Sequence, residues 1–252
     1  MRMAVAVLLV VIVLSYGAHW LAPYDPLATQ TKDALAPPGL AHPLGADLLG
    51  RDVLSRLLYG GRRTLTISFL ATLLAALPGL FTGIALGYVD HDHASILQLP
   101  LNAMLAIPGL ILALTVLTVL GAGAWSVALA VGISQFAPLS QVILTASRQA
   151  QNMQFVESAK ALGAGPIWIM IRHILPTVLP VFTAYTAVTF SYAIISGAAL
   201  SFLGLGGDPG VPDWGVMLAD GRAILQDAPW VSIAPGLLII ITVVAVNRIA
   251  EL

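Results

Sequence analysis

The sequence contains no cysteine and has little charge of either sign. Lys and Arg number 11 and Asp and Glu 12 among 252 residues, so charged residues make up 9% of the chain. Soluble domains contain about a quarter charged residues, and this composition is typical of a membrane protein. Without cysteine, disulfides and thiolate metal sites are excluded. The net charge of −1 argues against a nucleic-acid partner, which would require a basic face.

A phosphate-binding loop is also missing. Such a loop is a glycine-rich turn followed by Lys and then Ser or Thr, whereas the two lysines here are followed by Asp33 and Ala161. The chain itself is therefore not an ATPase, and we expect no catalytic residue, metal or cofactor in it. His91 and His93 could ligate a metal, but their short polar stretch is better explained as the tip of a hairpin between two apolar segments.

Long apolar runs dominate the sequence. Six of them have roughly the length that a bilayer core of about 30 Å requires, and they span residues 3–21, 64–88, 96–120, 125–145, 177–203 and 230–246. They carry almost no ionisable side chains and lack strict alternation, so lipid forces them to be helical. We expect an all-α membrane protein with six transmembrane helices, the first of which is a retained span and not a signal peptide.

The near absence of charge in these segments bears on mechanism. Ion-coupled carriers keep ionisable groups in their spans as relay points, so a secondary transporter is the less favoured alternative, and a non-transporting scaffold is a third. Intramembrane hydrolysis requires a serine with a buried His or Asp partner. Ser191, Ser196 and Ser201 have no such partner in their segment, which argues against it.

The chain divides into two regions. Residues 1–63 contain the first span, a proline-rich stretch and a segment in which Leu49, Val53 and Leu57 recur every fourth residue. Arg51 and Asp52 fall on other faces, a pattern that predicts an amphipathic helix lying on the membrane. Residues 64–252 form a five-span core that includes a Gly- and Pro-rich loop at 204–229.

Residues 155–180 carry charged side chains between two uncharged blocks. The glycine and proline residues within this segment predict two short helices. Asn152 is a candidate N-cap for the first. Gly163 can end that helix in a left-handed conformation, and Pro166 suits the first turn of the second. An apolar edge recurs in the first helix at Phe155, Ala159 and Leu162.

Beside this edge the first helix carries small and polar side chains. Ser158 and Ala161 would let another surface approach closely, and Glu157 and Lys160 can pair on the exposed side. An ordinary solvated loop helix is the alternative. Charge does not orient the segment, because an N-terminus inside leaves five basic residues on the cytoplasmic side and six on the outer side.

The same segment resembles the EAA motif of permease subunits in bacterial ABC importers. That pattern is Glu-Ala-Ala, three residues, Gly, nine residues, then Ile-x-Leu-Pro. Glu157, Gly163 and the pair Leu175-Pro176 occupy the matching positions. Ser158 replaces an alanine and His173 the isoleucine, and the latter form is typical of the peptide and nickel branch. Residues 42–65 and 200–222 also resemble that branch, so the resemblance covers nearly the whole chain.

The resemblance implies an arrangement and partners. The N-terminus and the segment at about 150–176, between spans four and five, would lie in the cytoplasm of a bacterial or archaeal cell, with the chain in its inner membrane. A second homologous permease would complete the path, two ATPase subunits would bind ATP and Mg, and an extracytoplasmic binding protein would deliver cargo. The residues expected to couple to an ATPase are Phe155, Val156, Glu157, Ser158, Ala159, Lys160, Ala161, Leu162 and Gly163.

Two further sets of residues are candidates for transport itself. Weakly polar side chains could line the path, although hydroxyls within spans also bond neighbouring helices; the candidates are Gln135, Ser140, Gln141, Thr183, Thr186 and Thr189. In the loop before the last span, Asp208, Asp213 and Trp214 could contact the binding protein, close the outer mouth or cap the structure. Dipeptides or oligopeptides are the expected cargo, and nickel or a metal chelate is the alternative.

Overall fold

The computed structural model describes residues 2–89, 96–206 and 210–250. Within these residues every regular element is a helix, and Ala46 and Asp52 form an isolated bridge. The longer helices are α1 (Arg2–Tyr16), α3 (Val53–Tyr88), α6 (Gly109–Leu120), α7 (Ala124–Gln151), α10 (Leu175–Phe202) and α12 (Trp230–Ala250). The short ones are α2 (Ala18–Leu21), η1 (Thr31–Asp33), α5 (Leu99–Leu105), α8 (Gln154–Ala161), α9 (Pro166–Ile169) and α11 (Trp214–Arg222).

Four helical segments are long and apolar enough to cross a membrane, which confirms the all-α membrane class. They are Val53–Tyr88, Ala124–Gln151, Pro166–Phe202 and Trp230–Ala250. The third is continuous because a π-helical turn, Met170–Ile174, joins α9 to α10. The bent pair of α5 and α6 would make a fifth. The remaining candidate, α1, has 15 residues.

The predicted span at 96–120 is not a single helix. It breaks between α5 and α6, whose axes differ by 100°. Pro108 explains the break, because its ring disfavours helical backbone at Ile107 and its nitrogen cannot donate to the preceding turn. α6 then begins at Gly109.

The predicted surface helix near residues 49–58 is also absent as a separate element. α3 begins at Val53, where the Asp52 carboxylate accepts a hydrogen bond from the Ser55 N–H at 2.8 Å, and it continues without interruption to Tyr88. Val53 and Arg56 are buried. Residues 53–58 therefore form the first turns of α3, and residues 49–52 precede that helix.

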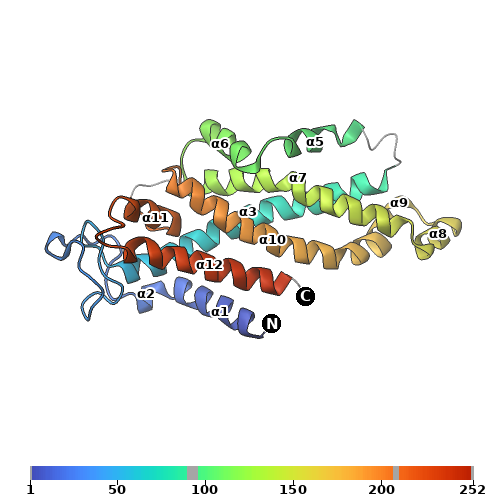
Figure 1. The fold of residues 1–252 in the computed structure, drawn as a ribbon. Helices are drawn as coiled ribbons and strands as arrows, with labels where there is room; N and C mark the ends of the chain where they lie inside the picture. The colour runs from blue at the N-terminus through green and yellow to red at the C-terminus, as the bar shows by residue number, and fades with distance from the viewer. Residues whose placement is uncertain (1, 90–95, 207–209, 251–252) are drawn as a thin grey trace.

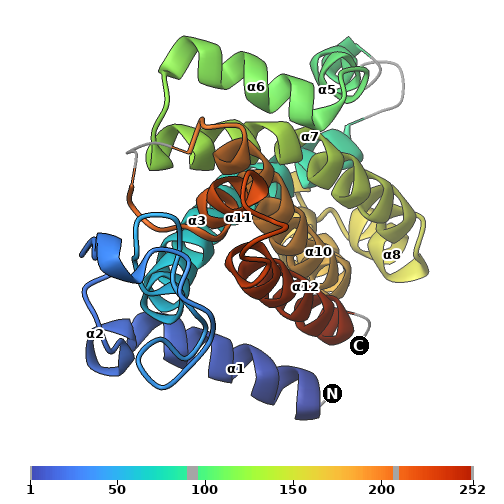
Figure 2. The ribbon, with the colours of Figure 1, turned by 60° about the vertical axis from the view of Figure 1, so that its left-hand side comes forward.

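The long helices form a bundle with two distinct ends (Figure 1). α2, α11 and the segment 22–52 gather at one end, here called the α11 end, and α8 and α9 extend from the other, the α8 end. Figure 2 shows α5 and α6 along one side of the bundle, over α7. α1 packs against α3 and α12 on a different side.

A stripe of glycines brings α3 and α7 into close contact. Gly79, Gly83 and Gly87 recur every fourth residue on α3 and face α7. A Cβ atom on Gly83 would lie 2.6 Å from the Cβ of Ile143, a separation that real Cβ atoms do not adopt. Small residues at such spacing let helix backbones approach in a membrane. The α3–α7 pair is the centre of the fold.

Candidate coupling surface and transport cavities

The first short helix forms where the sequence predicts it, with a different cap and a different buried face. Asn152 belongs to the end of α7, and Met153 precedes α8 without a side-chain cap. The buried face consists of Val156 and Ala159, which join the core cluster around Ile174.

The apolar edge predicted for α8 is therefore only partly correct. Ala159 is buried, whereas Phe155 is 42% exposed and Leu162 89% exposed. Residues 155 and 159 are four apart and lie on the same side of the helix. The core, however, contacts the neighbouring side, which carries Val156 and Ala159.

The end of α8 is built as predicted. Gly163 has a φ of +82°, and its N–H donates to the carbonyl of Lys160 at 3.0 Å. The N–H of Ala164 donates to the carbonyl of Ala159, also at 3.0 Å. These bonds satisfy the last carbonyls of the helix, and only glycine adopts the left-handed geometry without strain. Pro166 occupies the first turn of α9, with Gly165 at its N-cap.

Around α8 and α9 several large apolar side chains are exposed. Phe155, Leu162, Ile167, Trp168 and Ile171 are all more than 40% exposed there. We call these five residues, with the exposed Glu157, Ser158 and Lys160, the α8 surface. An apolar patch of this kind at the end of a bundle is typical of a docking site.

The predicted pairing of Glu157 with Lys160 is wrong. No ion pair joins them in the described chain; instead the Lys160 ammonium group lies over the ring of Tyr88, the last residue of α3. The carboxylate of Glu157 is thus left on the exposed face of α8.

Two of the predicted path residues, Gln135 and Thr189, line one cavity of about 340 Å³. This polar cavity lies where α5 breaks from α6, against α7 and α10. Its lining residues are Met104, Leu105, Ile107, Pro108, Gly109, Ser134, Gln135, Pro138, Tyr185, Val188, Thr189 and Tyr192. It therefore combines irregular backbone with several hydroxyl and amide groups.

The other predicted path residues lie elsewhere. Thr183 and Thr186 line a separate apolar groove of about 300 Å³, together with residues of α1, α3 and α12 such as Leu8. A helix turns by about 100° per residue, so Thr183 and Thr189 point about 120° apart. Ser140 is fully buried and donates to the carbonyl of Phe136 at 2.8 Å, which gives it a packing role at the α3–α7 contact.

At the α11 end, Asp213 and Trp214 are buried, so neither presents a surface for direct contact with another protein. The Asp213 carboxylate caps α11 by accepting from the N–H groups of Gly215 and Val216, and it also accepts from the Ser201 hydroxyl at 3.0 Å. Burial raises the pKa of Asp213 above its ordinary value of 3.8, while these bonds and the charge of Arg63 act in the opposite direction. Asp208 lies outside the described residues.

Trp214 connects the same loop to α3. Its indole N–H donates to the carbonyl of Leu57 at 3.0 Å, and its backbone N–H donates to the Thr64 hydroxyl at 3.1 Å. The two residues proposed as a contact surface thus fix α11 onto the bundle.

A buried ionic cluster holds the segment 22–52 against α11. Asp47 accepts from the Arg51 Nε at 2.7 Å and lies 3.3 Å from an Arg56 nitrogen. Both arginines also contact the carboxylate of Asp220 in α11, Arg56 at 2.8 Å. Arg56 is 1% exposed, so its charge is neutralised inside the protein. Arg56 is one of the six basic residues that an N-terminus inside places on the outer side, where we expected a surface charge.

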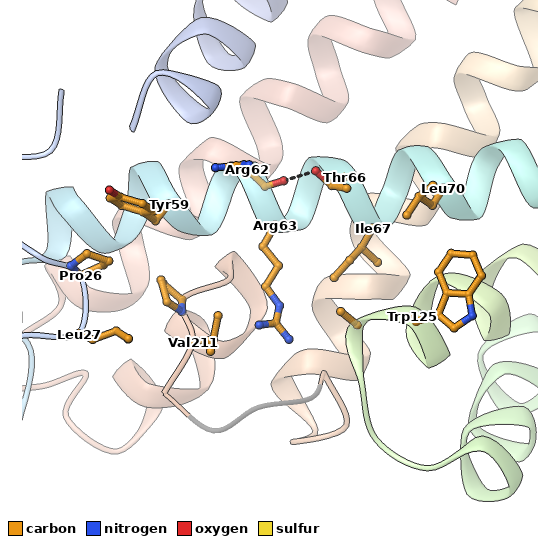
Figure 3. A pocket seen from close by; sticks show the side chains of 12 residues that line it. Pro26, Leu27, Tyr59, Arg62, Arg63, Thr66, Ile67, Leu70, Trp125 and Val211 are labelled. Carbon is orange, nitrogen blue, oxygen red and sulfur yellow. Dashed lines mark hydrogen bonds between the residues drawn. The ribbon is translucent and has the colours of Figure 1, made fainter. Parts of the chain in front are cut away.

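A larger pocket of about 590 Å³ opens between α3, the start of α7 and residues 211–212. In Figure 3, Arg63 extends from α3 between Val211 and Ile67, and Trp125 lies at the far side. An Arg63 nitrogen donates to the carbonyl of Gly206 at 3.0 Å. The pocket is otherwise largely apolar in its lining.

The architecture is that of a multi-pass helical membrane protein with exposed apolar side chains at the α8 end. No cluster of metal-ligating side chains occurs among the residues that the structure describes; His91 and His93 lie outside them. A family model described as "Binding-protein-dependent transport system inner membrane component" matches residues 48–252.

Curated relatives match over almost the whole chain. The di/tripeptide transport system permease protein DppC of Pseudomonas aeruginosa is 32% identical over 250 residues, covering 97% of this chain and 82% of that protein. The glutathione transport system permease protein GsiD of Escherichia coli O157:H7 is 35% identical over 252 residues, covering 100% and 83%. GsiD of Pectobacterium atrosepticum is 34% identical over 244 residues, covering 96% and 81%.

Solved structures agree on the fold. An inward-facing structure of the MetNI methionine ABC transporter matches with a TM-score of 0.62 at 17% identity, covering 78% of this chain and 95% of that chain. The chain belongs to the family of binding-protein-dependent transport system inner membrane components. It is a non-catalytic, inner-membrane permease subunit of an ABC transporter, which confirms the resemblance found in the sequence.

Proposed function

We propose that this chain forms half of the translocation path of an ATP-driven importer for dipeptides or oligopeptides. Two relatives support a peptide cargo, because one is named for di- and tripeptides and the other for glutathione. They favour peptides over nickel or metal chelates. A second homologous permease completes the path, two ATPase subunits bind ATP and Mg, and an extracytoplasmic binding protein delivers the peptide.

The topology we propose has six crossings, with the N-terminus and α8 in the cytoplasm. Tyr88 contacts Lys160 at the α8 end, whereas Trp125 lines the pocket at the α11 end. The chain between them must return along the bundle, so α5 and α6 together make the third crossing. The side chain of Ser15 lies against Gly61 near the α11 end, which supports a first crossing through α1 and α2.

The α8 surface is the single observation that carries the mechanism. One face of α8 is packed into the core, and the other carries exposed apolar side chains and the carboxylate of Glu157. This arrangement suits insertion of α8 into a cleft of an ATPase subunit. Movement of that subunit would shift α8 as a rigid body, and the continuous path through α9 and the π turn would carry the shift into α10. Such coupling requires contacts that differ between the two states.

Reconstitution of the complete complex in liposomes tests this proposal. Glu157→Arg should abolish ATP-dependent peptide uptake and reduce the amount of ATPase that co-purifies, since the side chain is exposed and the substitution leaves the core intact. Asp227→Arg is the matched charge reversal at the α11 end, where the side chain is also exposed, and it should retain the ATPase. Unchanged uptake in Glu157→Arg would show that the coupling assignment is wrong.

The same preparation separates the importer from a secondary carrier. This chain alone in liposomes should move no peptide along a proton or sodium gradient. If it did, the ion-coupled alternative would replace the importer model.

A further inference from the structure

The polar cavity is formed where α5 ends and α6 begins. On the facing side Pro138 lies inside the continuous helix α7, where its missing N–H cannot donate to the carbonyl of Ser134. Within a membrane, irregular backbone is tolerated only where it is enclosed by protein or lines a polar cavity. Both the α5–α6 break and Pro138 line this cavity, so backbone polar groups without a partner in their own helix lie at its wall.

Three side chains in this wall have no hydrogen-bond partner within the described chain. They are the amide of Gln135 and the hydroxyls of Tyr185 and Tyr192. Gln135 is only 8% exposed. Tyr192 is 36% exposed. These polar groups therefore face the space of the cavity, where they are available to bind a ligand.

The start of α6 opens onto the same place. The first hydrogen bond of this 12-residue helix runs from Leu112 to the carbonyl of Pro108, and no side chain caps its N-terminus. A Cβ atom on Gly109 would lie 3.0 Å from the Tyr192 hydroxyl and 3.7 Å from the Gln135 amide nitrogen. The helix N-terminus and two unpartnered side chains thus converge on one point, and the absence of a side chain at Gly109 leaves that point open.

We propose that the polar cavity is a cargo subsite, where the carboxylate of a small peptide is held by donors from Gln135, Tyr192 and the N-terminal turn of α6. The inference rests on the proposed function, because it assumes that peptide passes through this chain. Free N–H groups at a helix N-terminus bind anionic groups favourably. In transporters, the N-termini of broken helices point at anionic substrate groups near the membrane midplane.

The chemistry of the lining also suits transient binding. The cavity wall contains no Lys or Arg, so the carboxylate meets only neutral donors. A site in a transport path must bind the cargo strongly enough for the cargo to enter and weakly enough for it to leave. Neutral donors provide recognition of the carboxylate without a deep energy minimum.

Thiol labelling tests the subsite directly, because the chain has no cysteine. Thr189→Cys places a thiol in the polar cavity, and Thr186→Cys, one turn away on α10, places the matched control in the apolar groove. The complete complex is solubilised without the binding protein, so that only the membrane subunits respond. N-ethylmaleimide labelling of this chain is then followed with dialanine, with dialanine amide, and without peptide.

Dialanine should slow labelling of Thr189→Cys several-fold and leave Thr186→Cys unchanged, and dialanine amide should protect neither. Equal labelling of Thr189→Cys in all three conditions, repeated with Ser134→Cys, would overturn the subsite. Protection by both peptides would overturn the carboxylate assignment. Wild-type uptake in liposomes is measured in parallel: its absence would refute the proposed function, whereas uptake without protection would refute only this inference.

A functional pair completes the test. Gln135→Leu and Tyr192→Phe should lower peptide transported per ATP hydrolysed by several-fold while the ATPase rate stimulated by loaded binding protein is retained. Tyr16→Phe removes a hydroxyl outside the cavity and should leave the ratio unchanged. An unchanged ratio in both cavity variants would contradict the subsite.

Discussion

The ammonium group of Lys160 in α8 lies 5.6 Å from the centre of the Tyr88 ring at the end of α3. The contact attaches the proposed coupling helix to the helix that forms the centre of the fold. Val156 attaches it to the core on its buried side. α8 is therefore held at two points, and its exposed face keeps a fixed orientation toward a docking partner.

Loss of the Lys160 charge should loosen α8 locally. A cation over an aromatic ring at an exposed site contributes about 0.5–1 kcal/mol, so Lys160→Met should speed hydrogen exchange of the α8 amides by about 2- to 5-fold. Mass spectrometry of the peptide containing residues 154–161 measures this rate. Lys32→Met, at the other end of the molecule, is the control. Unchanged exchange in Lys160→Met would mean that the ring contact does not hold α8.

Adding a methyl group at Gly83 should destabilise the bundle. The new Cβ would meet both the side chain of Ile143 and the carbonyl of Ser140, at 2.6 and 2.7 Å, so the helices must separate. We expect Gly83→Ala to cost about 1–3 kcal/mol, seen as a lower melting temperature of the purified protein. Gly165→Ala, where nothing lies within 4 Å of the added atom, should change it far less. Equal effects would argue against close α3–α7 packing.

Removal of the Arg56 charge should be among the most destabilising changes at the α11 end. Arg56→Met leaves the carboxylates of Asp47 and Asp220 with only Arg51, and breaking a buried ion pair costs about 3–5 kcal/mol. SDS-induced unfolding measures the loss. Arg62→Met, on an exposed position, should fall within about 0.5 kcal/mol of wild type.

A double substitution checks that the effect comes from stranded charge. Arg56→Met combined with Asp47→Asn should be more stable than the sum of the single losses predicts, because the neutral amide no longer needs the guanidinium. Strictly additive losses would indicate that Arg56 acts through packing alone.

Asp213 should make stability depend on acid pH. Its pKa is raised by burial, so the native protein keeps a proton that the unfolded chain releases at lower pH. The stability that this bound proton adds to the native protein is fully present below pH 3.8, the ordinary pKa, and is lost as pH rises through the raised native pKa. The unfolding free energy of wild type, relative to Asp213→Asn, should therefore fall as pH rises above 3.8 and then level off.

The cap itself provides the control for this experiment. Asn keeps an oxygen that accepts from the N–H groups of Gly215 and Val216, whereas Asp213→Ala removes the cap at every pH and should cost about 1 kcal/mol. An unfolding free energy of wild type that rises with pH, relative to that of Asp213→Asn, would contradict the assigned direction.

Sequence reasoning succeeded where local rules decide the outcome. Gly163 and Pro166 act through backbone geometry alone, so the end of α8 and the start of α9 could be predicted. The apolar runs likewise predicted the long helices. The position of α8 in the chain followed from its charge between uncharged blocks, and the family followed from the EAA motif.

Tertiary contacts explain the failures. Arg56 was read as a surface charge because its partners, Asp47 and Asp220, are set by the fold of distant segments. For Asp213 and Trp214 the sequence left a contact surface, an outer gate and a structural cap as alternatives. Both residues are buried and Asp213 caps α11, which the sequence did not distinguish. The break near Pro108 had a local signal, the adjacent Pro and Gly, which the even hydrophobicity of residues 96–120 obscured. Tyr185 and Tyr192 had no local signal as cavity residues.

The glycine stripe on α3 also constrains how the chain assembles. α5 and α6 are synthesised between α3 and α7, yet the contact at Gly83 leaves no space for any helix between those two. The intervening pair must therefore remain at the periphery while α7 inserts and docks. The polar cavity, which α5 and α6 help to line, therefore lies beside the α3–α7 pair and never between those two helices.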